Sequence, residues 1–194
     1  MSAAGPVMSA RTRNAVSADE PDWARERPRE FWDPGRKLIK TLRDYNRLGE
    51  RNDPVSALRR SLIVLRHRFW SAVTACDIPL GFNPGGGFML PHPTGVVIHP
   101  RTIVGVNCRV MQQVTLGAAG RPRKFISAPD TEGSEDRKGA PTLGGHVDVG
   151  AGAKIIGPLK IGDHAVIGAN AVVLIDVPAG ATAVGVPARL LPPD

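Results

Sequence analysis

The stretch LGGHVDVGAGAKIIGPLKIGDHAVIGANAVV, residues 143–173, carries an aliphatic residue at every sixth position. Neither the 3.6-residue period of a helix nor the 2-residue period of a strand produces a repeat of six. A coil with flat faces does, when each face is one short strand followed by one tight turn. The stretch therefore predicts stacked coils around a narrow aliphatic interior. The repeated positions are Leu143, Val149, Ile155, Ile161, Ile167 and Val173.

The same frame extends in both directions along the chain. A second small or aliphatic residue follows four positions later in each unit, and a glycine follows the first aliphatic residue in four of the six units. We expect these glycines to allow the turns. The second interior set is Val147, Ala153, Leu159, Ala165, Ala171 and Val177. The upstream interior positions are Ile98, Val104, Val110 and Leu116, with Thr102, Cys108 and Val114 as their second set.

The frame is interrupted between residues 118 and 140. The segment GRPRKFISAPDTEGSEDRKG, residues 120–139, is polar and has no periodicity. It predicts a loop extruded from one corner of the coil, which is a common place for functional residues.

Residues 21–76 have a helical pattern instead. Asp33-Pro34 and Asp53-Pro54 each predict an N-cap followed by proline at the first helical position, and Gly49 predicts the end of the first helix. Apolar residues recur at three- and four-residue spacing along the second helix, and its RR and RHR clusters favour a solvated face. A membrane-surface or polyanion patch is the alternative. The recurring residues are Leu58, Leu62, Leu65, Phe69 and Val73.

Residues 1–20 predict a disordered tail, because they contain no apolar segment of the kind found in secretory signals. The net charge of +7 comes mainly from the first 76 residues, so the charge does not predict a nucleic-acid enzyme. The sequence contains no run of about 18 apolar residues, so it predicts no transmembrane helix. Two cysteines, Cys76 and Cys108, favour reduced thiols in a cytoplasmic protein.

Four motifs connect the repeat frame to a known family. DIPLGFNPGGGFMLPHPTGVVI, residues 77–98, places Asp77 fifteen residues before His92. QQVTLG (112–117), GAGAKIIG (150–157) and VGVPARL (184–190) follow in order and in frame. Together they resemble the serine acetyltransferase branch of the hexapeptide-repeat acyltransferases, over residues 77–191. The resemblance implies a mainly β fold, a left-handed parallel β-helix of three units per coil preceded by a short α-helical N-terminal region.

The resemblance also implies an activity and a site. It implies an acetyl-CoA-dependent O-acetyltransferase that transfers acetyl to the hydroxyl of L-serine in cysteine biosynthesis, with no metal. His92 would be the general base and Asp77 would orient its imidazole. His92 stands six residues before Ile98, so the frame predicts an inward position for it. A homotrimer would bind CoA between subunits at Gly117, Gly152, Ala153, Gly168, Ala169, Gly185, Val186, Pro187 and Arg189.

Two departures bear on the acceptor. The family has an aspartate immediately before the catalytic histidine, where this chain has Pro91. Alignment of the prolines puts Ala140 in place of a second family histidine, whereas Arg137 could still bind a carboxylate. The acceptor is therefore L-serine or, alternatively, a sugar or polysaccharide hydroxyl.

Two other functional classes are alternatives to an acetyltransferase. His146 and His164 stand eighteen residues apart, one coil, and could form a metal-dependent β-helix enzyme, although such enzymes use three histidines. A surface pair is the simpler interpretation. The other class is a non-catalytic trimeric scaffold. The chain ends at LLPPD, so we expect no C-terminal tail for a cysteine-synthase partner.

Overall fold

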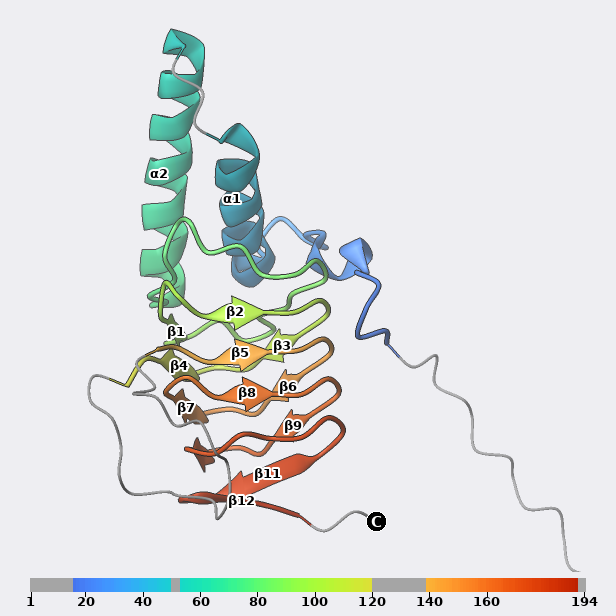
Figure 1. Cartoon of the computed structure of the whole chain (residues 1–194). Coiled ribbons are helices and arrows are strands. Elements are labelled where there is room, and N and C mark those ends of the chain that lie inside the picture. Colours follow the sequence, from blue (N-terminus) through green and yellow to red (C-terminus); the bar gives the residue numbers. More distant parts are fainter. Residues whose placement is uncertain (1–15, 50–52, 120–138, 192–194) are drawn as a thin grey trace, which may run out of the picture.

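Short parallel strands form a β-helix with three faces, and two helices stand on one end of it (Figure 1). The computed structural model describes residues 16–49, 53–119 and 139–191. Sheet A contains β1 (Val97–Ile98), β4 (Thr115–Gly117), β7 (Lys154–Ile156) and β10 (Val172–Val173). Sheet B contains β3 (Arg109–Val110), β6 (Asp148–Val149), β9 (Val166–Ile167), β11 (Thr182–Gly185) and β12 (Ala188–Leu190). Sheet C contains β2 (Ile103–Val104), β5 (Thr142–Leu143) and β8 (Lys160–Ile161).

The strand register confirms the predicted coil. Val97 pairs with Thr115 and Asp148 pairs with Val166, each eighteen residues further along the chain, so one turn of the coil comprises three units of six. Every residue of the predicted interior sets is buried, from Ile98 to Val177. The chain passes from sheet A to C, from C to B and from B to A, and these three edges are called here the A–C, C–B and B–A corners.

The glycines that follow the interior aliphatic residues are required by close contact between neighbouring coils and not, as the sequence predicts, by the turns. Gly144 does not adopt a positive φ; instead, a Cβ on it would lie 2.9 Å from the backbone nitrogen of Asp163 in the next coil. A Cβ on Gly150 would lie 2.7 Å from the nitrogen of Ala169. The left-handed conformations occur two residues later and are taken by other residue types as well, namely Asn107, Gln113, His146, Gly152, His164 and Asn170. Glycine is therefore required by the close stacking of coils.

We expect Gly105→Ala to lower the free energy of unfolding by about 1–3 kcal/mol, the usual cost of overpacking. Its Cβ would lie 2.4 Å from the carbonyl oxygen of Gly144, which is backbone and cannot rotate away. Thermal denaturation followed by circular dichroism measures the change. Gly81→Ala is the control, because its Cβ would meet no atom within 4 Å. Equal melting temperatures for the two variants would contradict the stacking argument.

Two helices follow the short 3-10 helix η1 (Trp23–Glu26): α1 (Pro34–Leu48) and α2 (Pro54–Thr74). The Asp33 side chain accepts a hydrogen bond from the Arg36 nitrogen, and Asp53 accepts one from the Ser56 nitrogen. Each aspartate therefore satisfies a backbone donor of the first helical turn. Figure 1 shows both helices extending from the end of the coil stack, roughly along its axis. No helix among the described residues is long and apolar enough to cross a membrane.

The orientation of α2 differs from the sequence interpretation. Its predicted apolar stripe lies outward, and Leu65 is 66% exposed. Two residues of the RHR cluster lie inward instead. The Arg66 guanidinium contacts Asp44 and Thr41 of α1, and the His67 ring nitrogen Nε2 lies 3.0 Å from the Ile78 carbonyl oxygen. The helix therefore turns Arg66 and His67 inward and most of its predicted apolar stripe toward solvent.

A buried ion pair joins η1 to α1 and to the first coil. Arg43 makes two hydrogen bonds to the Glu26 carboxylate, at 2.7 and 3.0 Å, and further ones to Asn83, Pro84 and Gly85. Glu26 also accepts a hydrogen bond from the Phe88 nitrogen. Because these side chains are only 11% and 9% exposed, the pair acts in a largely dry environment.

Residues 16–20 belong to the segment for which the sequence predicts a tail, and the structure places them against the C–B corner. The Asn107 amide donates to the carbonyls of Ser17 and Glu20, and its oxygen accepts from the Asp22 nitrogen. Residues 120–138 lie outside the described residues. The Ala119 nitrogen donates to the Gly139 carbonyl, so this segment leaves and re-enters the coil at the A–C corner.

The far end of sheet B is covered by a strand of opposite direction. β11 pairs in parallel with β9, and β12 then pairs antiparallel with β11, matching Ala183 with Leu190. The turn between β11 and β12 contains the cis peptide bond Val186–Pro187.

Candidate functional site

His92 lies at a corner with two additional residues. Met89 forms an isolated β-bridge with Arg109, and Asp77 forms one with Val97. The two residues of each bridge are twenty positions apart in the sequence, whereas paired residues of the regular coils are eighteen apart. Residues 89–97 are common to both of these intervals, so they contain the insertion. Leu90 is buried, whereas His92 is exposed. The inward position predicted for His92 is therefore wrong, because the longer turn carries it out of the frame.

The turn around His92 is held by the ends of both helices. The Thr94 nitrogen donates to the His92 carbonyl at 2.9 Å, and the Gly95 nitrogen donates to the Thr74 carbonyl at the end of α2. The Cys76 thiol donates to the Pro93 carbonyl. Gly35, in the first turn of α1, packs so closely that a Cβ would lie 2.3 Å from the Leu90 carbonyl oxygen. The imidazole thus projects from a braced loop.

Asp77 lies beside this turn. Its nitrogen donates to the Val96 carbonyl, and its carbonyl accepts from the Ile98 nitrogen, both at 2.9 Å. Its side chain is exposed, and no hydrogen bond within the described residues joins its carboxylate to the imidazole of His92. The structure therefore brings the two predicted catalytic residues to the same corner, on neighbouring backbone segments.

The B–A corner continues below His92 as a column of stacked turns. The Gln113 nitrogen donates to the Thr94 carbonyl, the Gly152 nitrogen to the Gln112 carbonyl, and the Asn170 nitrogen to the Ala151 carbonyl. The turn from Gly185 to Pro187 follows at the end of β11. Most of the residues predicted to bind CoA lie on this column, namely Gly152, Gly168, Ala169, Gly185, Val186 and Pro187.

The remaining predicted site residues lie elsewhere. Ala153 is fully buried in the coil interior, so its side chain cannot contact a ligand. Gly117 ends β4 on sheet A beside Ile156. Arg189 is exposed on β12, and Pro91 is exposed beside His92. Arg137 lies outside the described residues. Ala140 lies at the A–C corner, and so does not belong to the column below His92.

Sequence reasoning missed three polar residues of the B–A corner. Gln112 and Gln113 form the turn directly below His92, and the Lys154 ammonium group donates to the Gln113 carbonyl. The Gln112 side-chain oxygen is buried without a hydrogen-bond partner. One feature of the sequence could have identified this corner. Gln113 is a large polar residue at a turn position where the next two coils have Gly152 and Asn170. The corner therefore combines an imidazole, an amide and a cation.

The other titratable groups among the described residues do not form a competing site. Burial raises the pKa of the Cys108 thiol to about 11 and also raises the pKa of Cys76, so both stay protonated near neutral pH. The Nδ1 atoms of His146 and His164 lie 2.9 Å apart at the C–B corner, and desolvation is the main cause of the lowered pKa of His146. Within the described ranges, His, Cys, Asp and Glu side chains form no group of three or more that could hold a metal ion.

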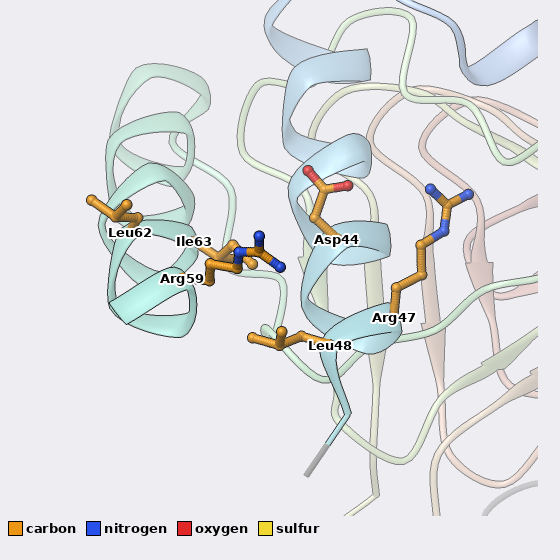
Figure 2. A pocket seen from close by; sticks show the side chains of 6 residues that line it. All are labelled: Asp44, Arg47, Leu48, Arg59, Leu62 and Ile63. Carbon is orange, nitrogen blue, oxygen red and sulfur yellow. The ribbon is translucent and has the colours of Figure 1, made fainter. Parts of the chain in front are cut away.

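A shallow cavity of about 410 Å³ lies between α1 and α2 (Figure 2). It is lined by Leu48 at the end of α1, whereas Gly35 at the beginning of α1 packs against the turn that carries His92. Two arginines, Asp44 and three aliphatic residues line it, and none of these is a base or nucleophile suited to acyl transfer. The cavity therefore does not compete with the B–A corner. Its lining residues are Asp44, Arg47, Leu48, Arg59, Leu62 and Ile63.

Comparisons with known proteins agree with the motifs. No family model matches the chain. A serine acetyltransferase from Helicobacter pylori (strain J99) is 42% identical over 122 residues, covering 63% of this chain and 64% of that protein. One from Synechococcus elongatus is 40% identical over 119 residues, covering 61% of this chain and 43% of that protein. A solved serine acetyltransferase in complex with CoA has a TM-score of 0.62 and 32% identity, covering 83% of this chain and 58% of that one.

The chain therefore spans 43–64% of the length of these relatives. Its similarity to them includes both sequence and structure. Over the part that aligns, the chain is therefore similar to serine acetyltransferases.

Proposed function

We propose that this protein is an acetyl-CoA-dependent serine O-acetyltransferase whose active site is the B–A corner. The observation that carries the proposal is that His92 stands at the head of the column on which most of the predicted CoA residues lie. A solved relative contains CoA, and the curated relatives are named serine acetyltransferases. We also propose the left-handed coil, the homotrimer with CoA between its subunits, and the cytoplasmic location that the motifs and unpaired thiols indicate.

The reaction follows from the chemistry of an exposed imidazole. A ring nitrogen of His92 accepts the proton of the serine hydroxyl while the hydroxyl oxygen attacks the thioester carbonyl of acetyl-CoA. The tetrahedral intermediate collapses as its carbon–sulfur bond breaks, and the thiolate of CoA takes the proton from the imidazolium. The products are O-acetylserine and CoA. Asp77 would accept a hydrogen bond from the other ring nitrogen once substrate orders the corner, fixing the tautomer.

The small residues of the column suit a long linear ligand. Backbone amides at Ala169 and Gly185 can reach a pantetheine chain without obstruction from large side chains. Lys154 supplies a positive charge beside the same corner, where it can attract a phosphate of CoA. Arg137 remains a candidate for the serine carboxylate.

The departures at Pro91 and Ala140 give a specific reason to test a second acceptor class. Neither residue can reproduce the charge or the hydrogen bonds of the aspartate and histidine that the resemblance leads one to expect. A sugar hydroxyl, which has neither an amino nor a carboxylate group to be recognised, would not need them.

Release of the CoA thiol from acetyl-CoA by the purified full-length protein tests the proposal. L-serine, a panel of free and nucleotide-linked sugars, and a reaction without acceptor are compared. Release that depends on L-serine supports the proposed function. Release only with a sugar retains acetyl transfer and overturns the serine assignment. No release above the acceptor-free reaction with any acceptor, from folded protein that binds CoA, overturns the enzymatic proposal and favours a scaffold.

A further inference from the structure

The exposed side of α2 is a narrow apolar stripe. Five large residues on it are each more than half exposed: Val55 58%, Leu58 64%, Leu62 58%, Leu65 66% and Phe69 53%. They are separated alternately by three and four residues, which is the a/d spacing of a coiled coil. A contiguous exposed patch of this kind marks an interaction surface, whereas single exposed apolar residues are ordinary. We call these five residues the α2 seam.

The α2 seam faces mostly away from α1, although Leu62 at its edge also lines the cavity between the two helices. Trp70 is buried and packs edge-on against Trp32, and Arg66 contacts Asp44 of α1. Figure 2 shows Leu62 on the side of α2 away from α1, while Ile63 and Arg59 point toward α1. The contact with α1 therefore leaves the seam uncovered.

We propose that the α2 seam is the core of a parallel coiled coil formed with α2 of other copies of this chain. In heptad positions, Val55, Leu62 and Phe69 are a residues, and Leu58 and Leu65 are d residues. Ala72 completes the next d position and is also exposed. The 3.5-residue repeat keeps one narrow line of side chains facing a partner helix over five turns.

The charges beside the seam favour parallel copies. In a parallel pair each g residue faces the e residue five positions later on the partner helix. This register places Ser61 opposite Arg66 and Arg68 opposite Val73, so no arginine faces another arginine. An antiparallel pair brings e positions together instead, and two of them are Arg59 and Arg66. Arg66 is in addition neutralised by Asp44 within its own chain.

The attachment of α2 also favours parallel copies. The helix ends at Ala75 in a left-handed conformation, with the Cys76 nitrogen bonded to the Ser71 carbonyl, and Asp77 already pairs with Val97 of sheet A. No flexible linker separates the helix from the coil. Since α2 runs along the stack in Figure 1, copies related by an axis parallel to the stack have parallel α2 helices.

Other occupants fit less well. The segments outside the described residues contain no long apolar repeat: residues 1–15 are mostly small or polar, and residues 120–138 contain only Phe125 and Ile126 as large apolar residues. A membrane-surface helix exposes its cations to the lipid headgroups. Here only Arg59 and Arg68 of the four α2 arginines are exposed, whereas Arg66 is bound to Asp44 and Arg60 donates to the Gly49 carbonyl. The seam therefore fits a second copy of itself best.

Cysteine cross-linking in the full-length protein tests the proposal independently of acetyl transfer. Leu58→Cys and Leu65→Cys place thiols at d positions, where identical residues of parallel helices meet within the Cα separation of about 4.4–6.8 Å that a disulfide requires. Ala57→Cys is the matched control, because Ala57 is exposed on the same helix but lies off the seam. Cys76 and Cys108 are buried and contribute little background.

Under mild oxidation we expect the two seam variants to form disulfide-linked pairs at least about tenfold faster than Ala57→Cys, since assembled thiols have effective concentrations near millimolar. Their rates should not depend on protein concentration. Equal rates for all three variants would overturn the proposal. Preferential linkage of Leu58→Cys to Phe69→Cys in a mixture would overturn the parallel orientation.

A charge on the seam supplies a second readout. Leu62→Arg with Leu65→Arg is expected to abolish the cross-linking of Leu58→Cys while leaving the circular dichroism spectrum unchanged, because both leucines are exposed. Flotation with vesicles of phosphatidylglycerol and phosphatidylcholine tests the competing surface. Binding of wild-type protein that this double variant removes, together with slow seam cross-linking, would assign the stripe to a membrane and overturn the coiled coil.

Discussion

Replacement of His92 by alanine is expected to lower kcat for acetyl transfer by about 10²–10⁴-fold, the usual contribution of a positioned general base. The imidazole is exposed at the head of the B–A corner, and the turn that carries it is held by backbone atoms and by Cys76. Its loss should therefore leave the fold and the binding of CoA intact. Steady-state kinetics of CoA-thiol release, with calorimetric titration of CoA, measures both quantities.

His99→Ala is the matched control for this variant. His99 belongs to the same coil but lies after β1, where its ring nitrogen Nδ1 accepts a hydrogen bond from the Arg101 nitrogen. We expect its kcat to stay within about threefold of the wild-type value, since it has no part in proton transfer. An alanine variant of His92 that retained more than about a tenth of the wild-type kcat would remove this residue from the role of base.

Arg43→Ala is expected to lower the free energy of unfolding by about 3–5 kcal/mol, because it leaves the carboxylate of Glu26 buried without its partner. Arg43 makes five hydrogen bonds, two to Glu26 and three to residues 83–85 of the first coil. For a chain of this size the loss corresponds to a fall in Tm of about 6–20 °C. Thermal and urea denaturation, followed by circular dichroism, measure it.

Arg47→Ala is the control for Arg43, since Arg47 lies on the same helix and is exposed. Its Tm should change by less than about 2 °C, as is usual for surface substitutions. Arg43→Lys tests the geometry: an ammonium group cannot donate to the carboxylate and to three other oxygens at once, so we expect it to recover only part of the lost stability. Full recovery by lysine would show that charge alone matters at this position.

The coil interior could be predicted residue by residue, because a period of six leaves few alternatives. Every aliphatic position from Ile98 to Val177 is buried as the frame requires. The frame failed at His92 for a geometric reason. It assumes turns of constant length, and the two additional residues in LPHPTG move Leu90 into the interior and His92 to the surface. A repeat frame alone does not show where such an insertion lies.

Two other differences between the sequence prediction and the structure arise from contacts between neighbouring elements. The glycines after the aliphatic residues are required by the backbone of the neighbouring coil, as at Gly144 and Asp163. The stripe on α2 has the spacing of a buried face, yet it points away from α1. Periodicity identifies which residues share a face, but it does not identify what lies opposite. For the site, motif spacing brought Asp77 and His92 to one corner, whereas Gln112 and Lys154 required the stacking of coils to be known.

The reversed direction of β12 has a consequence for solubility. A stack of parallel strands ends in a row of free amide and carbonyl groups, which can template the addition of another chain and so lead to fibres. β12 occupies that row on sheet B, and its antiparallel register with β11 prevents a further coil from continuing the winding there. The opposite end is covered by α1 and the residues around Glu26. The winding therefore ends at β12 on sheet B and at the helical cap on the opposite end, which gives the repetitive coil a defined length.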